Sequence, residues 1–93
     1  MQSYKISDIC TKLFFKISML TEIEKFVIGE VKKLRTERNM SQADLALSIG
    51  VSIGFIGKVE SLRYNSKYNL NHINNIAKTL NISPKDLLPK EHL

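Results

Sequence analysis

The sequence is poor in cysteine, with one residue, Cys10, in a chain of 93. A single thiol cannot close an intrachain disulfide, and it has no second thiolate with which to hold a zinc ion. This excludes a disulfide-stapled secreted scaffold and a zinc finger, and it is typical of a protein of the reducing cytoplasm.

Long hydrophobic runs are also missing. A membrane-spanning helix needs about 20 consecutive apolar residues, whereas the apolar run Leu13–Phe15 is bordered by Lys12 and Lys16. Asp8 and Lys12 interrupt the apolar region that a secretory signal peptide requires. We therefore expect no membrane partner, no signal peptide and a cytoplasmic location.

The composition is otherwise that of an ordinary globular domain, with 43% hydrophobic and 25% charged residues. A chain of this length buries only roughly 60–65% of the surface that it exposes when unfolded, which leaves room for one core. No glycine-rich phosphate loop or pair of carboxylates is present, and His72 and His92 have no second ligand at a metal spacing. We expect no enzyme activity, no cofactor, no metal and no small-molecule substrate.

Acidic residues are the scarcer charged class. The chain has 14 Lys and Arg against 9 Asp and Glu, a net charge of +5, which suits a polyanion such as nucleic acid. The basic excess is confined to the flanks: residues 21–60 contain six basic and six acidic side chains, whereas 61–93 contain five basic and two acidic. Charge therefore supports DNA binding only as a secondary feature.

Helix start signals recur along the chain. Thr21 and Glu24 have the spacing of a capping box, and Ser41 and Ser83 are further cap residues. Between the caps, apolar residues recur with the period of a helix. These stripes are Ile23, Phe26, Val27, Val31 and Leu34; Leu45, Ala46 and Ile49; Ile56 and Val59; Ile73, Ile76, Ala77 and Leu80; Leu87 and Leu88.

The spacing predicts an all-α domain over residues 21–88 with a short tail over 89–93. Its five predicted helices cover about 22–39, 41–49, 52–60, 70–80 and 84–88. No alternating run typical of a strand occurs.

The first 20 residues have an apolar pattern of their own. The residues at helical spacing are Ile6, Ile9, Cys10, Leu13, Phe14, Ile17 and Leu20. They predict an amphipathic helical extension over 1–20. Three interpretations are open: an extra helix or partly ordered arm on the domain, a dimerisation helix that buries its apolar stripe, or a non-functional segment before a natural start at Met19.

Residues 41–60 have the pattern of two short helices that cross after a tight turn. Gly50 follows the last periodic residue of the first helix, where a left-handed backbone is needed. Ala46 is small where two helices must approach closely, and Ile49, Ile56 and Val59 supply apolar contacts between them. This is the helix-turn-helix pattern.

Five short motifs extend the pattern beyond these two helices. They are Leu34-Arg35, Ser41-Gln42-x-x-Leu45-Ala46, Ile49-Gly50-Val51-Ser52, Ile56-x-x-Val59-Glu60 and Ile76-Ala77-x-x-Leu80-x-Ile82-Ser83. With this spacing, residues 28–88 resemble the helix-turn-helix domain of the phage-repressor and Cro type, also called XRE-like. The resemblance implies a lambda-repressor-like helical bundle and a small transcriptional regulator that binds double-stranded DNA in a sequence-specific way as a homodimer.

The resemblance also implies roles for individual residues. In this family the second motif helix enters the major groove and reads base edges with its N-terminal residues. The matching positions are Ile53, Gly54, Phe55, Gly57 and Lys58.

Other matching positions imply contacts with the DNA backbone and one internal ion pair. Gln42 and Ser52 stand at helix N-termini, which favour phosphate, and Arg63 and Lys67 lie in the loop after the recognition helix. Arg35 and Glu60 match a pair that forms an internal salt bridge.

The recognition helix departs from the usual pattern of polar base readers. It has Ile53, and its two glycines, Gly54 and Gly57, each cost a helix about 1 kcal/mol relative to alanine. One interpretation is close approach of the helix backbone to DNA, with Ile53 or Phe55 on a thymine methyl and specificity taken from DNA shape. The alternative is a protein-interaction module, such as an antitoxin-like or anti-repressor component, with the same fold.

Overall fold

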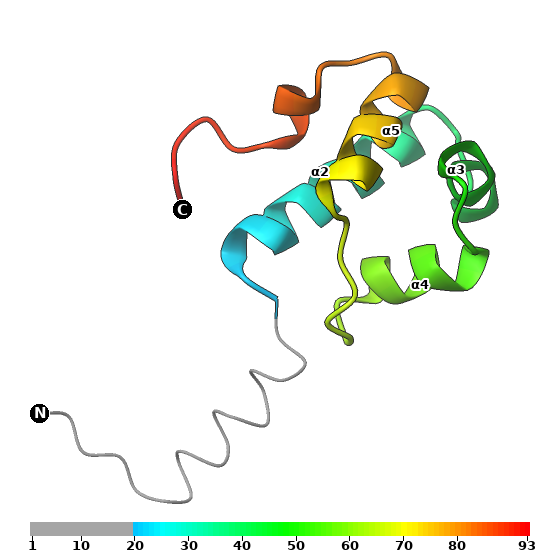
Figure 1. The fold of residues 1–93 in the computed structure, drawn as a ribbon, viewed down its shortest axis with the longest axis horizontal. Helices are drawn as coiled ribbons and strands as arrows, with labels where there is room; N and C mark the ends of the chain where they lie inside the picture. The colour runs from blue at the N-terminus through cyan, green and yellow to red at the C-terminus, as the bar shows by residue number, and fades with distance from the viewer. Residues whose placement is uncertain (1–19) are drawn as a thin grey trace, which may run out of the picture.

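The computed structural model describes residues 20–93, and throughout this part of the chain the fold is helical without strands (Figure 1). Its elements are α2 (Glu22–Glu37), α3 (Gln42–Ile49), α4 (Ile53–Ser61), α5 (Leu70–Leu80) and the 3-10 helix η1 (Pro84–Leu87). The all-α prediction is confirmed, and each predicted boundary lies within two residues of the observed one. The extension predicted over 1–20 lies outside the described residues except for Leu20.

Side-chain caps fix where the helices begin. The Thr21 hydroxyl accepts a hydrogen bond from the Glu24 N–H (3.3 Å), and the Glu24 carboxylate accepts one from the Thr21 N–H (2.9 Å). The same reciprocal arrangement joins Ser41 to Asp44 and Asn69 to His72. At Ser83 the hydroxyl accepts the Lys85 N–H, and the Asp86 carboxylate accepts the Ser83 N–H. Because these carboxylates accept backbone N–H groups, the pKa values of Glu24 and Asp44 are lowered. Local sequence therefore satisfies the backbone donors that a helix N-terminus leaves unpaired.

The apolar stripes meet in a single core to which every described helix contributes. The side chains with no exposed surface are Val31, Leu45, Ile56, Val59 and Leu87, together with Ile76. Burying an aliphatic side chain of this size contributes about 1.5–3 kcal/mol. In Figure 1, α5 lies against α2 and α3, with α3 at the right of the domain and α4 below it.

Two details of the predicted stripes differ in the structure. Ile23 is 44% exposed, whereas Ile28, which the predicted stripe omits, is 2% exposed. In the last element Leu87 is fully buried but Leu88 is 42% exposed. The chain forms only a short 3-10 turn there, with room for one of the two leucines against the core.

The turn between α3 and α4 depends on a left-handed residue. Gly50 has φ 74° and ψ 35°, and the next residue, Val51, donates its N–H to the Ala46 carbonyl at 3.0 Å. This geometry closes the C-terminus of α3 and turns the chain into α4. No atom outside the local chain lies within 4 Å of a Cβ placed on Gly50, so the requirement for glycine is purely conformational.

Alanine substitutions at two glycines isolate the effect of the left-handed backbone at Gly50. Gly29 lies within α2 and, like Gly50, has open space where a Cβ would lie, but its backbone is helical. We expect Gly50→Ala to lower the free energy of unfolding by about 1–2 kcal/mol because alanine disfavours the left-handed region. We expect Gly29→Ala to raise it by up to about 1 kcal/mol. Urea unfolding checks both, and a shift of the same sign in the two variants would contradict the assignment.

Candidate nucleic-acid interface

Helices α3 and α4 form the helix-turn-helix unit that the sequence predicts. They meet at 118° across the short turn at Gly50–Ser52. This angle lies in the range of about 90–120° that is typical of the motif. Ala46 is 1% exposed at the crossing, and Leu45 and Ile56 are fully buried on either side. The second helix is therefore held rigidly across the first.

Helix α4 has an inner and an outer face. Ile56 and Val59 are fully buried, whereas Ile53 is 56% exposed and Gly54 and Lys58 are also exposed. Three of the five predicted base readers thus share the outer face of one helix. The polar N-terminus of this helix is capped by Ser52, whose hydroxyl accepts the Phe55 N–H at 3.0 Å.

The structure places the other two predicted readers differently. Phe55 is half-buried: its ring centroid lies 5.1 Å from that of His72 and 6.2 Å from that of Tyr68, and it packs against the core. Gly57 faces α3, since a Cβ there would lie 3.8 Å from the Gln42 amide oxygen. Contact of Phe55 with DNA remains a prediction.

Lys58 has an aromatic neighbour that the sequence did not single out. Its ammonium nitrogen lies 5.5 Å from the centroid of the Tyr64 ring, and Tyr64 is 49% exposed in the loop after α4. A cation–π contact at an exposed site contributes about 0.5–1 kcal/mol. In the sequence, an aromatic residue next to the basic Arg63 is the signal that could have pointed to this contact.

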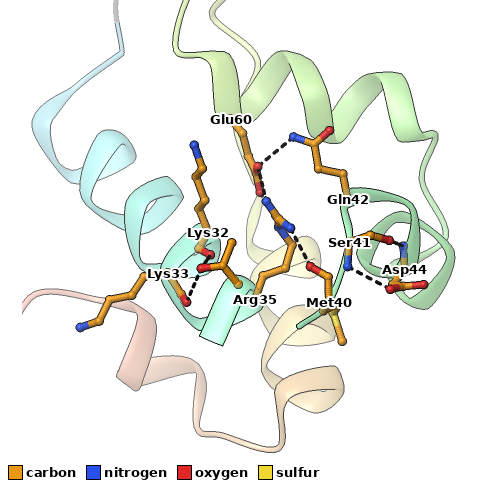
Figure 2. Close-up of polar contacts among 9 residues, drawn as sticks. Lys32, Lys33, Arg35, Met40, Ser41, Gln42, Asp44 and Glu60 are labelled. Carbon is orange, nitrogen blue, oxygen red and sulfur yellow. Dashed lines mark hydrogen bonds and ion pairs between the residues drawn. The ribbon is translucent and has the colours of Figure 1, made fainter. Parts of the chain in front are cut away.

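A buried polar network ties three helices together at the inner face of α4 (Figure 2). Arg35 of α2 donates from Nε and Nη2 to the two carboxylate oxygens of Glu60, at 2.9 and 2.8 Å, and from Nη1 to the Met40 carbonyl at 2.6 Å. The amide of Gln42 donates to the same carboxylate at 2.9 Å. The side chains of Arg35 and Glu60 are only 8% and 2% exposed. The expected ion pair is therefore present and satisfied on both partners.

Gln42 has a structural contact in addition to its predicted contact with a phosphate. Its amide nitrogen is engaged by Glu60 at the inner face of α4, so the side chain joins the start of α3 to the recognition helix. The Ser41 hydroxyl takes the Asp44 N–H in the first turn of α3, and the other N–H groups of that turn favour an anion. A side-chain contact with phosphate would compete with the Glu60 bond.

Tyr68 lies near this network, and its side chain is buried. Its hydroxyl is buried and has no hydrogen-bond partner in the part of the chain that the structure describes. Burial, together with the nearby Glu60 carboxylate, raises the pKa of the Tyr68 hydroxyl well above its ordinary value. The hydroxyl therefore stays neutral and serves as part of the core.

The two predicted backbone contacts of the loop have different surroundings. Arg63 is exposed directly after α4. The ammonium of Lys67 instead forms an ion pair with Glu24 at 3.0 Å, which joins the loop to the start of α2. A DNA contact by Lys67 would have to replace that pair.

Within residues 20–93, no cluster of three or more His, Cys, Asp or Glu side chains has a geometry that could hold a metal ion. No single helix there is long and apolar enough to cross a membrane; α3 and α4 taken together would suffice by length and composition alone, across their 118° bend.

Comparison with known proteins adds to this geometry. The family described as the Cro/C1-type HTH DNA-binding domain matches residues 30–89. A similar solved structure is the restriction-modification controller protein C.AhdI from Aeromonas hydrophila, with 32% identity over 67% of this chain and 92% of that chain and a TM-score of 0.56. No curated protein matches the sequence.

Two further solved structures share the fold at lower identity. A chain of the SinR protein/SinI protein complex has 21% identity, a TM-score of 0.60 and coverage of 71% of this chain and 63% of that chain. The hypothetical transcription factor NHTF from Neisseria has 23% identity, a TM-score of 0.60 and coverage of 78% and 88%. The lambda-repressor-like fold class expected from the sequence is confirmed.

Loss of either partner of the buried ion pair should destabilise the domain strongly. We expect Arg35→Met and Glu60→Met each to lower the free energy of unfolding by about 3–5 kcal/mol, because each leaves a buried charge unpaired. The double variant should lose much less than the sum of the two.

Lys67→Ala is the matched control, because it removes the more exposed pair with Glu24 and should cost less than about 1 kcal/mol. Urea unfolding of the four variants measures these differences. Single variants of the buried pair that cost no more than Lys67→Ala would show that the pair does not hold α2 and α4 together.

Proposed function

The chain belongs to the Cro/C1-type HTH DNA-binding domain family. On this basis we propose that it is a small transcriptional regulator. It binds a specific double-stranded DNA site with α4 in the major groove. The observation that carries the proposal is the outer face of α4. Ile53, Gly54 and Lys58 remain exposed on a helix whose opposite side is buried against α3.

Each exposed position has a distinct chemical role in this proposal. The Lys58 ammonium can donate to the O6 and N7 atoms of a guanine, and Ile53 can contact a thymine methyl. Gly54 is exposed and has no side chain, which would let the helix backbone approach the base edges closely. With one charged reader, the protein would take a further part of its specificity from DNA shape.

The phosphate contacts would come from the edges of the unit. The N-termini of α3 and α4, at Gln42 and Ser52, present backbone N–H groups and the positive end of a helix dipole. Arg63 is exposed beside the end of α4 and can pair with a phosphate. The neutral charge of residues 21–60 leaves the general attraction to DNA to such residues outside the motif.

We further propose that the regulator acts as a homodimer in the cytoplasm. One nine-residue helix can read only a few base pairs, and a two-fold dimer doubles the site. The two half-sites would then lie about 34 Å apart, one turn of the DNA helix, or a multiple of that distance.

A protein-binding role is the second candidate function. The apolar side chains Leu47, 85% exposed, and Ile53, 56% exposed, project from the two motif helices. A similar fold occurs in SinR, which was solved in complex with the SinI protein. Such a surface suits a protein partner as well as a thymine methyl.

Selection of binding sites from a random DNA library at two salt concentrations tests the main proposal. We expect an enriched site with two-fold symmetric halves and an affinity that falls steeply with salt, because each phosphate contact releases counterions. Sedimentation of the free protein measures whether it is a dimer. No DNA retention at low salt, together with a co-purifying protein, would instead favour the second candidate.

Replacing the charged reader should reduce specificity. We expect Lys58→Ala to weaken binding to the selected site by about 1–3 kcal/mol and binding to random DNA by much less. Lys78→Ala is the control, because Lys78 is an exposed lysine near the end of α5. Fluorescence anisotropy with both DNAs gives the two affinities. Equal weakening on both would show that Lys58 contacts a phosphate rather than a base.

A further inference from the structure

Tyr64 is the exposed member of the Phe and Tyr side chains within residues 20–93. Phe26 and Phe55 are half-buried and Tyr68 is buried, whereas Tyr64 is 49% exposed. Its ring lies outside the core cluster and the side chains that pack against it. The ring is instead beside the proposed base reader Lys58, whose ammonium nitrogen lies 5.5 Å from the ring centroid. Packing in the core therefore does not account for the position of this ring, and the outer face of α4 is the feature next to it.

A turn at the end of α4 brings Tyr64 back to Lys58. In a continuing helix, residue 64 would lie about 9 Å further along the axis than residue 58 and on a different face. Leu62 ends the helix instead, with a left-handed φ of 60° and ψ of 12°. The other left-handed residues of the described chain are one glycine and two asparagines, which tolerate this conformation better than leucine does. The contact between the ring and the ammonium depends on this unfavourable turn.

The side chain of Ser61 ties the start of the loop to α4. Its hydroxyl donates to the Lys58 carbonyl at 2.8 Å and accepts the Arg63 N–H at 3.3 Å. The Leu62 N–H donates to a carbonyl of the same helical turn, that of Val59, at 3.4 Å. The backbone that leads to the Tyr64 ring is therefore bonded to the turn of α4 that carries Lys58.

An aromatic neighbour leaves the charge of Lys58 available to DNA. The ion pairs within residues 20–93 join other side chains, so Lys58 has no carboxylate partner in this part of the chain. A carboxylate would neutralise the ammonium and accept its N–H groups, as Glu24 does for Lys67. The face of an aromatic ring attracts the ammonium and leaves it charged. Because a lysine loses rotamer freedom when it binds, a neighbour that already restricts it reduces that loss.

We propose that Tyr64 is a positioning residue for DNA recognition, whose ring holds the Lys58 ammonium at the outer face of α4, where it donates to a guanine. The role rests on the proposed function, in which Lys58 reads a base. It acts on the selected site much more than on random DNA, since only the selected site presents that base. Tyr64 thus contributes to specificity through Lys58, without contacting a base itself.

NMR of the free protein measures the contact in the absence of DNA. An aromatic ring shifts the resonances of protons near its face upfield. We therefore expect the ε-methylene protons of Lys58 to move downfield in Tyr64→Ala and to keep their position in Tyr64→Phe. Asn65→Ala is the matched control, because Asn65 is the next residue of the loop and is also exposed. Identical Lys58 shifts in the wild type and Tyr64→Ala would overturn the proposal.

Fluorescence anisotropy with the selected site and with random DNA measures the effect on recognition. We expect Tyr64→Ala to weaken binding to the selected site about two- to fivefold, the range given by an exposed cation–π contact, and to leave binding to random DNA nearly unchanged. Tyr64→Phe keeps the ring and should bind like the wild type, as should Asn65→Ala. In a Lys58→Ala background, Tyr64→Ala should cause no further loss. Circular dichroism verifies that each variant is folded.

The other outcomes contradict the proposal in different ways. The same loss from Tyr64→Ala with and without Lys58 would show that Tyr64 acts on DNA independently. Weaker binding of both DNAs by Tyr64→Phe would show that the hydroxyl contacts a phosphate. A wild-type protein that selects no DNA site would overturn the proposed function and the positioning role together. A wild-type protein that binds its site no better than Tyr64→Ala would overturn the positioning role alone.

Discussion

The buried ion pair between Arg35 and Glu60 is the interaction on which the geometry of the molecule depends. It joins α2 to the end of α4, and Gln42 and the Met40 carbonyl add bonds from the start of α3 and the loop before it. Two charges removed from water are tolerable only when their hydrogen-bonding capacity is met. Because the geometry that meets it is narrow, the network specifies one orientation of α4 relative to the rest of the domain.

That fixed orientation separates the two faces of α4. The apolar contacts of Ile56 and Val59 bind the helix to the core, and the ion pair anchors its last turn. The residues left outside are Ile53, Gly54 and Lys58, a small apolar and weakly charged surface. A rigid helix with this outer face can approach DNA closely without first ordering itself, which reduces the entropy lost on binding.

The net positive charge of the chain lies outside the residues that build the helix-turn-helix unit. Residues 21–60 are neutral as a whole, and three of their acidic residues serve the fold: Asp44 caps α3, Glu24 caps α2 and Glu60 pairs with Arg35. Even Lys67, in the basic C-terminal part, is engaged by Glu24. In the proposed complex, electrostatic attraction to DNA would therefore come from exposed residues around the motif, and the motif would supply shape.

The sequence by itself determined the helices, their caps and the turn at Gly50, because these depend on contacts within about four residues along the chain. The helix-turn-helix spacing also predicted the Arg35–Glu60 pair through its resemblance to a known family. Only the tertiary structure turned Phe55 inward against Tyr68, engaged Gln42 with Glu60 and paired Lys67 with Glu24. Each of these contacts joins residues at least 13 positions apart, so its partner is decided by how the helices pack and leaves no local signal in the sequence.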